Sequence, residues 1–246
     1  RQGTNGTEKS SIVAARPALD VKKSGPNAGL EIPYDPALII RAQSLLLEDA
    51  DKLSASRPYR FDLVDVQRQM MTNLGQLIHR KAAEAFRSKD REAFTLHSER
   101  FLGMLADMDT LLRTRSEYSF DRWLTEARSW GETEEEKNQM ERDATSLVTI
   151  WGADGDPRIF DYSWREWAGL INGYYLPRWQ KFYTMLQQHL DEGTSYEEAG
   201  LPQIYGREAF RANDFYHALA EWELSYVDTY GKARIPATDR YSQTSV

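Results

Sequence analysis

The chain has 246 residues, with 31 Lys and Arg against 38 Asp and Glu, which gives a formal net charge of −7. Its length is enough for a domain with a real core, and its 41% hydrophobic and 12% aromatic content excludes a disordered chain. The acidic balance argues against nucleic acid as a partner, because phosphate binding needs a basic face. No apolar run approaches the roughly 18 residues of a membrane span, and the first residues do not resemble a signal peptide.

The first part of the chain, residues 1–33, contains scattered Gly, Pro, Ser and Asn and has no sustained hydrophobic period. This composition predicts an extended N-terminal arm or linker, in which Ile12 and Val13 could pair as a short strand. We assign residues 34–231 to an α-helical domain and residues 232–246 to a polar tail.

Helical periodicity begins directly after the arm. Asp35 and Pro36 have the residue types favoured at an N-cap and at the first helical position. The apolar positions that follow recur at steps of three and four residues in three stripes: Leu38 to Leu53, Val64 to Ala85 and Phe94 to Leu112.

Four more helices are predicted in the second half, at about residues 123–130, 133–150, 162–190 and 206–230. Thr133 and Glu136 form a capping box, Pro177 is expected to kink the long helix, and Gly193 is expected to end it. Because β-rich runs do not alternate with the helices, an eight-stranded β/α barrel is excluded. The predicted fold class is all-α, a single bundle of about six to eight helices.

Motifs for metal or cofactor chemistry are missing. The sequence has no Cys, and its four His residues do not form the Glu-x-x-His pairs of di-iron bundles; only Asp214 and His217 have a related spacing. We expect no metal site and no cofactor. The acidic run from Glu132 to Glu136 is interpreted as a solvated helix start rather than as a pair of catalytic carboxylates.

Aromatic residues concentrate between positions 151 and 183. Most recur at helical steps, which is typical of a heavily packed central helix. Trp151 differs, because it ends a helix beside a loop that runs from Gly152 to Pro157 and contains two Asp residues. Aromatic rings near carboxylates suit sugars, whose apolar faces stack while their hydroxyls form hydrogen bonds. The residues alone leave a ligand role and core packing equally open for Trp151.

An ordered series of short segments is the most specific signal in the chain. The segments are Arg16–Leu19, Tyr59–Asp65, Trp123–Arg128, Thr149–Gly152, Asp161–Tyr162, Trp167–Leu170, Tyr174–Tyr175 and Pro177–Trp179. Together they resemble the C-terminal helical domain of the α-N-acetylglucosaminidases, glycoside hydrolase family 89. The resemblance covers roughly residues 11 to 232.

This resemblance implies a whole protein with a small N-terminal domain, a catalytic (β/α) barrel and an all-α domain last. It also implies exo-acting, retaining hydrolysis of terminal α-linked N-acetylglucosamine by two barrel carboxylates about 5 Å apart. No catalytic residue is therefore expected in this chain, which is expected to be inactive alone. The expected partners are the upstream barrel and glycans that end in this sugar, and the expected location is secreted, periplasmic or lysosomal.

The resemblance also implies that the helical domain forms one wall of the substrate cleft. Trp151 in the T-x-W-G motif is the first candidate for the sugar pocket and Ile159 the second, with Tyr162 and Asp156 as further candidates. Four matching residues are interpreted mainly as helix packing and internal ion pairing: Asp161, Tyr162, Arg178 and Trp179.

The alternative is a stand-alone helical module that binds protein or glycan without hydrolysis. A domain that docks on a barrel predicts an exposed apolar patch, whereas an independent module predicts a concave pocket that is complete within its own chain.

Overall fold

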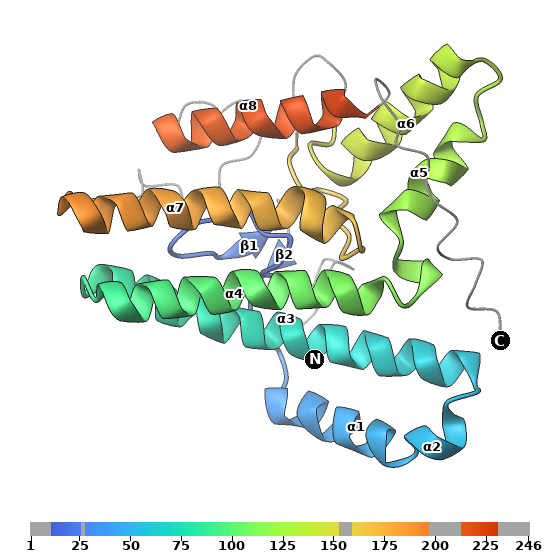
Figure 1. Ribbon diagram of the computed structural model, residues 1–246, viewed down its shortest axis with the longest axis horizontal. Helices are drawn as coiled ribbons and strands as arrows, with labels where there is room; N and C mark the ends of the chain where they lie inside the picture. Colours follow the sequence, from blue (N-terminus) through green and yellow to red (C-terminus); the bar gives the residue numbers. More distant parts are fainter. Residues whose placement is uncertain (1–10, 26–27, 153–158, 197–212, 231–246) are drawn as a thin grey trace.

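The computed structural model describes residues 11–25, 28–152, 159–196 and 213–230 (Figure 1). Over these ranges the chain forms eight α-helices and one pair of very short strands, so the predicted all-α class and number of helices are confirmed. Among these helices, none combines the length and the apolar character that a bilayer crossing requires. The helices are α1 Pro36–Glu48, α2 Ala50–Leu53, α3 Arg57–Arg87, α4 Arg91–Leu112, α5 Phe120–Arg128, α6 Glu134–Val148, α7 Leu176–Glu192 and α8 Asp214–Thr229.

The helices α1, α3, α4, α7 and α8 lie side by side in this order, and the α5–α6 hairpin packs at one end (Figure 1). The α3–α4 hairpin is at the centre. Ser56 and Asp90 cap the two helices by accepting hydrogen bonds from the backbone N–H groups of Tyr59 and Ala93. The stripe predicted from Phe94 to Leu112 is buried throughout, which confirms this helix.

The α5–α6 hairpin contains the predicted capping box. Thr133 Oγ1 accepts a hydrogen bond from Glu136 N (3.2 Å), and the Glu136 carboxylate accepts one from Thr133 N (3.0 Å). Helix α5 ends at Arg128, two residues before the predicted end at about residue 130. The prediction that Trp130 belongs to this helix is therefore wrong, and its side chain is 83% exposed.

The long helix predicted from residue 162 begins later. Residues 162–169 are irregular, and a π-helical turn, η2 (Ile171–Tyr175), leads directly into α7. Pro177 lies in the first turn of α7, where its missing N–H removes no α-helical hydrogen bond, so the predicted mid-helix kink is replaced by a change from π to α geometry. Gly193 ends α7 in the left-handed conformation, as predicted (φ 70°).

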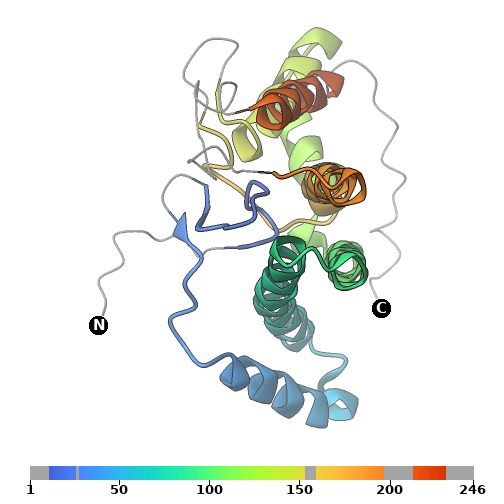
Figure 2. The ribbon, with the colours of Figure 1, turned by 90° about the vertical axis from the view of Figure 1, so that its left-hand side faces the viewer.

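Residues 11–25 of the predicted arm have an irregular backbone, but they lie within the bundle, and Ile12 to Ala15 are almost completely buried. Ile12 and Val13 form a turn rather than the strand considered from the sequence. The short antiparallel pair is instead β1 (Lys23–Ser24) with β2 (Ala28–Gly29). Figure 2 shows this segment on the same side of the helices as the segment after α6. The domain boundaries at 33 and 231 stay predictions.

Helix α1 begins as predicted, with Asp35 as the N-cap and Pro36 in the first turn, and a break at Asp49 separates it from α2. Its predicted apolar face does not pack against the bundle, because Leu38 and Leu45 are more than half exposed. At the other end of the chain, Asn213 caps α8, whereas the predicted start near residue 206 and the tail at 232–246 lie outside the described residues.

Candidate functional site

Trp151 lies where the chain leaves α6. Its backbone is left-handed (φ 41°), a conformation that is rare for a bulky side chain. Trp151 N donates a hydrogen bond to the carbonyl of Ser146 (2.7 Å), and Ser146 Oγ donates one to the carbonyl of Gly152 (2.8 Å). Ile159 N donates to the carbonyl of Trp151 (3.1 Å), so hydrogen bonds from both ends of the loop fix the position of this tryptophan.

Three of the four candidates for the sugar pocket lie together. The rings of Trp151 and Tyr162 are 4.7 Å apart at an interplanar angle of 54°. Tyr162 N also donates to the carbonyl of Ile159 (3.1 Å). All three side chains are partly buried, which leaves part of each accessible. The fourth candidate, Asp156, lies outside the described residues.

The residues that hold this group from the inside were missed as functional residues in the sequence. Asp161 has a left-handed backbone (φ 58°), and its N–H donates to the carbonyl of Thr149 (2.7 Å). The Asp161 carboxylate pairs with Arg178 (2.8 Å), which confirms the internal ion pairing expected for these two residues. Glu223 of α8 also pairs with Arg178 (3.1 Å). A single Glu on a helix is normally solvent-exposed, so no sequence pattern marks it.

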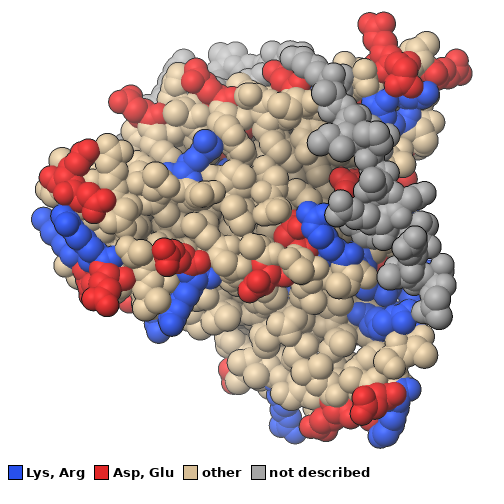
Figure 3. All heavy atoms as spheres, in the orientation of Figure 1, with Lys and Arg blue, Asp and Glu red and all other residues tan. Residues whose placement is uncertain are grey.

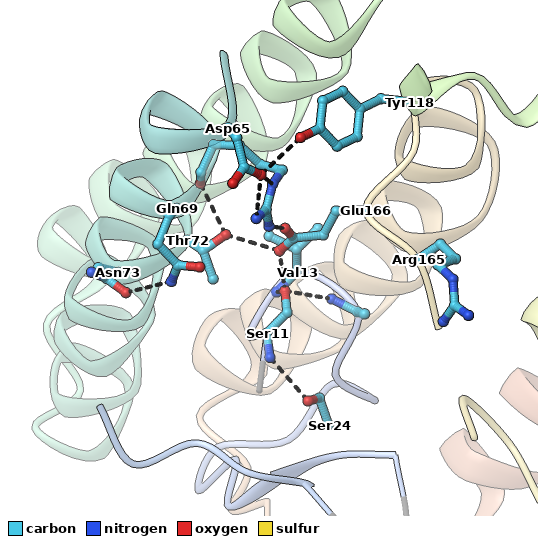
Figure 4. Close-up of polar contacts among 12 residues, drawn as sticks. Ser11, Val13, Ser24, Asp65, Gln69, Thr72, Asn73, Tyr118, Arg165 and Glu166 are labelled. Carbon is cyan, nitrogen blue, oxygen red and sulfur yellow. Dashed lines mark hydrogen bonds and ion pairs between the residues drawn. The ribbon is translucent and has the colours of Figure 1, made fainter. Parts of the chain in front are cut away.

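A second buried polar cluster surrounds Glu166 (Figure 4). The Glu166 carboxylate accepts hydrogen bonds from Ser11 and Thr72 and pairs with Arg68, which also pairs with Asp65 (2.8 Å). Both carboxylate oxygens of Glu166 are therefore occupied by partners from the arm and α3. This arrangement joins three segments of the chain and leaves Glu166 unsuited to proton transfer.

Two surface cavities lie elsewhere on the described structure. One of about 350 Å³ is lined by the arm and α3, including Leu19, Lys22 and Arg80. The other, of about 580 Å³, lies near the ends of α3 and α7 and includes Lys89 and His189. Neither cavity is lined by the Trp151–Tyr162 pair, so the candidate site is not one of these two pockets.

The comparisons with known proteins agree with the resemblance seen in the sequence. The family model described as the α-N-acetylglucosaminidase C-terminal domain matches residues 1–244. The chain belongs to this family. The human α-N-acetylglucosaminidase is 30% identical over 199 residues, which are 80% of this chain and 25% of the human protein.

Solved structures related to this C-terminal domain give the same result. A family 89 glycoside hydrolase from Clostridium perfringens, in complex with PUGNAc, matches with a TM-score of 0.74 and 26% identity. A variant of the Clostridium perfringens enzyme in complex with its substrate GlcNAc-α-1,4-galactose matches with a TM-score of 0.73 and 28% identity. Both matches cover 87% of this chain and 23% of the other chain. The C-terminal domain described here thus spans about a quarter of the length of its relatives.

Proposed function

We propose that this chain is the C-terminal helical domain of an exo-acting, retaining α-N-acetylglucosaminidase. In this proposal it packs on a (β/α) barrel that precedes it in the same protein, and Trp151 with Ile159 and Tyr162 forms one wall of the sugar cleft. The observation that carries the proposal is the Trp151–Tyr162 ring contact at the exit of α6, where both rings remain partly accessible. The compartment, whether secreted, periplasmic or lysosomal, stays a prediction from the family.

The aromatic pair has the properties that a sugar wall requires. An indole ring offers a flat apolar surface to the C–H face of a pyranose, and the backbone hydrogen bonds of Trp151 hold this surface in place and so lower the entropy cost of binding. Both rings of the pair remain partly accessible, so a second surface that faces them would enclose a ligand there. A barrel that opens its active site at one face supplies such a surface and excludes water from the cleft.

The buried carboxylates support placing the catalytic pair in the barrel. Each of the five buried Asp and Glu side chains among the described residues pairs with an arginine, namely Asp109, Glu141, Asp161, Glu166 and Glu223. A retaining glycosidase needs one carboxylate free to attack and one free to carry a proton, about 5 Å apart. Carboxylates held by arginines suit structural roles instead, so we assign no catalytic residue to this chain.

Exposed apolar side chains on α1 support the packing on a barrel. Leu38 and Leu45 lie two turns apart on one face of this helix and are 59% and 52% exposed. Leu74 and Leu77 on α3, the helix that packs against α1, are 48% and 49% exposed. Figure 3 shows one face of the molecule, on which uncharged areas lie between acidic and basic side chains at the edges and near the middle.

The occupant of the α1 surface in our proposal is the upstream barrel, since the matched family is a C-terminal domain and about three quarters of each relative lies outside the matched part. Leu45→Glu is expected to weaken the contact between domains and to lower the melting temperature of the whole protein. The same substitution is expected to leave the unfolding of the isolated chain unchanged, because this side chain is already solvated there. Equal effects on both would place the α1 surface outside the interface.

The proposed function is tested by release of aryl alcohol from an aryl α-N-acetylglucosaminide. This chain and the product of its full reading frame are assayed side by side. We expect activity only in the full product. Activity of the chain alone would contradict the assignment of the catalytic carboxylates to the barrel. Inactivity of both would favour the alternative of a stand-alone helical module that binds protein or glycan.

A further inference from the structure

Partly accessible and buried side chains alternate along the chain around the Trp151–Tyr162 pair. Trp151, Ile159 and Tyr162 are partly accessible, whereas their chain neighbours Ile150 and Phe160 are almost completely buried. These two neighbours form a small hydrophobic cluster with two residues of α8, Ala220 and Val227. Ile150 and Phe160 therefore pack against α8, and the outward residues form the proposed sugar surface.

Beneath this cluster lies a group of four charged side chains, which we call the ion quartet: Arg16, Asp161, Arg178 and Glu223. All four side chains are completely buried. Arg178 Nη1 contacts both oxygens of Asp161 (2.8 and 2.9 Å) and one oxygen of Glu223 (3.1 Å). Arg16 contacts the other oxygen of Glu223 (2.8 Å). Two positive and two negative side chains thus balance without solvent.

The ion quartet connects four segments that are far apart in the sequence. Arg178 Nη2 also donates to the carbonyls of Ala14 and Ala15 (2.9 and 3.0 Å), which ties α7 to the arm. The guanidinium of Arg16 lies 4.7 Å from the ring centroid of Phe160, the residue before Asp161. The arm, the 159–162 segment, α7 and α8 are therefore held in one arrangement.

The backbone of Asp161 is the point where this arrangement reaches the aromatic pair. Asp161 is left-handed and bonded to Thr149, two residues before Trp151, and Tyr162 follows it directly. A side chain at Gly25 would approach the Asp161 carbonyl to 2.5 Å, so the arm also packs closely against this peptide. Asp adopts the left-handed conformation more readily than most residues, and here the bond to Thr149 and the close packing of the arm hold it. Burial raises the pKa of the Asp161 carboxyl, and Arg178 opposes this rise.

We propose that the ion quartet is a positioning device for the Trp151–Tyr162 pair, which sets the affinity of the sugar site without contacting the sugar. This inference rests on the proposed function. Buried ion pairs often stabilise a fold no better than well-packed apolar residues, but in some proteins they specify a geometry, because each partner must meet the other at a fixed distance and angle. Asp161, Arg178 and Glu223 act here as positioning residues and not as catalytic residues.

The test is a double-mutant cycle in the whole enzyme between Asp161→Asn and Trp151→Ala. Asn is isosteric with Asp and tolerates a left-handed backbone, so the change removes mainly the charge. We expect Asp161→Asn alone to raise KM for the aryl glycoside about tenfold while kcat changes less than twofold. In the Trp151→Ala background the same change is expected to alter kcat/KM less than twofold, since the pair it positions is already removed.

Matched controls separate positioning from loss of folded protein. Glu141→Gln removes another buried carboxylate, paired with Arg128 (2.7 Å) in the α5–α6 hairpin, and is expected to lower the melting temperature without raising KM. Glu223→Gln is a second test of the ion quartet rather than a control. The hydrogen bonds of the Glu223 side chain go to Arg16 and Arg178 and not to Trp151 or Asp161, and the substitution is expected to raise KM as Asp161→Asn does. All assays are run well below the melting temperature of each variant.

The outcomes distinguish this inference from the proposed function. Equal losses from Asp161→Asn in both backgrounds, or no loss at all while Trp151→Ala is impaired, would overturn the positioning role and leave the sugar wall intact. A KM that rises equally in Glu141→Gln would also overturn it. Trp151→Ala kinetics identical to those of the wild type would remove Trp151 from the cleft, so that the proposed wall fails and the inference with it.

Discussion

Trp151 and Trp179 belong to the same ordered series of family segments but lie in opposite environments. Trp179 is completely buried, contacts the rings of Phe101 (4.7 Å) and His79 (4.8 Å), and donates a hydrogen bond from Nε1 to the carbonyl of Val13 (3.3 Å). Trp151 is partly exposed, and its own backbone N–H and carbonyl are both hydrogen-bonded, to Ser146 and Ile159. The helix boundaries decide the difference, because Trp179 lies within α7 and faces the core, whereas Trp151 follows the end of α6.

The comparison predicts a large loss of stability at the buried tryptophan. Trp179→Ala is expected to lower the free energy of unfolding by about 3 to 5 kcal/mol, because it leaves a cavity inside the aromatic core. Urea unfolding of this chain measures the effect, with Trp130→Ala as the control, since the Trp130 side chain is 83% exposed. A change below about 1 kcal/mol at Trp179 would contradict the core assignment.

The aromatic core around Trp179 also predicts a pH dependence. Burial lowers the pKa of His79 to about 4, while its ordinary value is 6.5. Below pH 6.5 the unfolded chain takes up a proton that the folded chain does not, so stability falls as the pH falls toward 4. The loss from this residue is about 2 to 3 kcal/mol between pH 7 and pH 4.5.

His79→Gln tests this pH dependence, because Gln can keep a hydrogen bond to the Tyr183 hydroxyl, which lies 2.8 Å from His79 Nδ1. Urea unfolding at pH 7 and pH 4.5 is expected to show a smaller loss in the variant than in the wild type. The same loss in both proteins would mean that His79 does not contribute to acid sensitivity.

Trp167 provides an intermediate case between the two tryptophans. It belongs to the aromatic stretch between positions 151 and 183, most of which was predicted to pack in a central helix, but it is only partly buried, and its ring centroid lies 5.7 Å from that of Trp123. We expect Trp167→Ala to cost about 2 kcal/mol, less than Trp179→Ala, because less surface returns to water. The melting temperatures of the two variants, measured together, check the order, and a larger loss at Trp167 would reverse our comparison.

The helices could be predicted from the sequence wherever a local rule decides the structure. The capping box at Thr133, the cap at Asp35, the stop at Gly193 and the stripe after Phe94 depend on neighbours within about four residues. Trp151, Ile159 and Tyr162 were recognised as candidates through the family resemblance, because spacing alone left Trp151 undecided. Their proximity is a result of the structure.

The remaining features depend on contacts between distant parts of the chain. The burial of Arg16 in a segment without hydrophobic period requires Glu223, which lies 207 residues away. The exposed leucines of α1 follow an ordinary helical stripe, and only the packed bundle shows that this stripe faces outward. The late start of α7 reflects the π-helical turn before Pro177, which has no simple signature in residue spacing.

The central claim is that this domain supplies an aromatic wall to a cleft whose catalytic groups lie elsewhere. The most direct measurement is kcat/KM of the full reading-frame product for an aryl α-N-acetylglucosaminide, with Trp151→Ala beside Trp130→Ala. We expect Trp151→Ala to lower kcat/KM tenfold or more, about 1.4 kcal/mol or above, with little change in melting temperature, and Trp130→Ala to change neither. Unchanged kinetics in Trp151→Ala would contradict the claim.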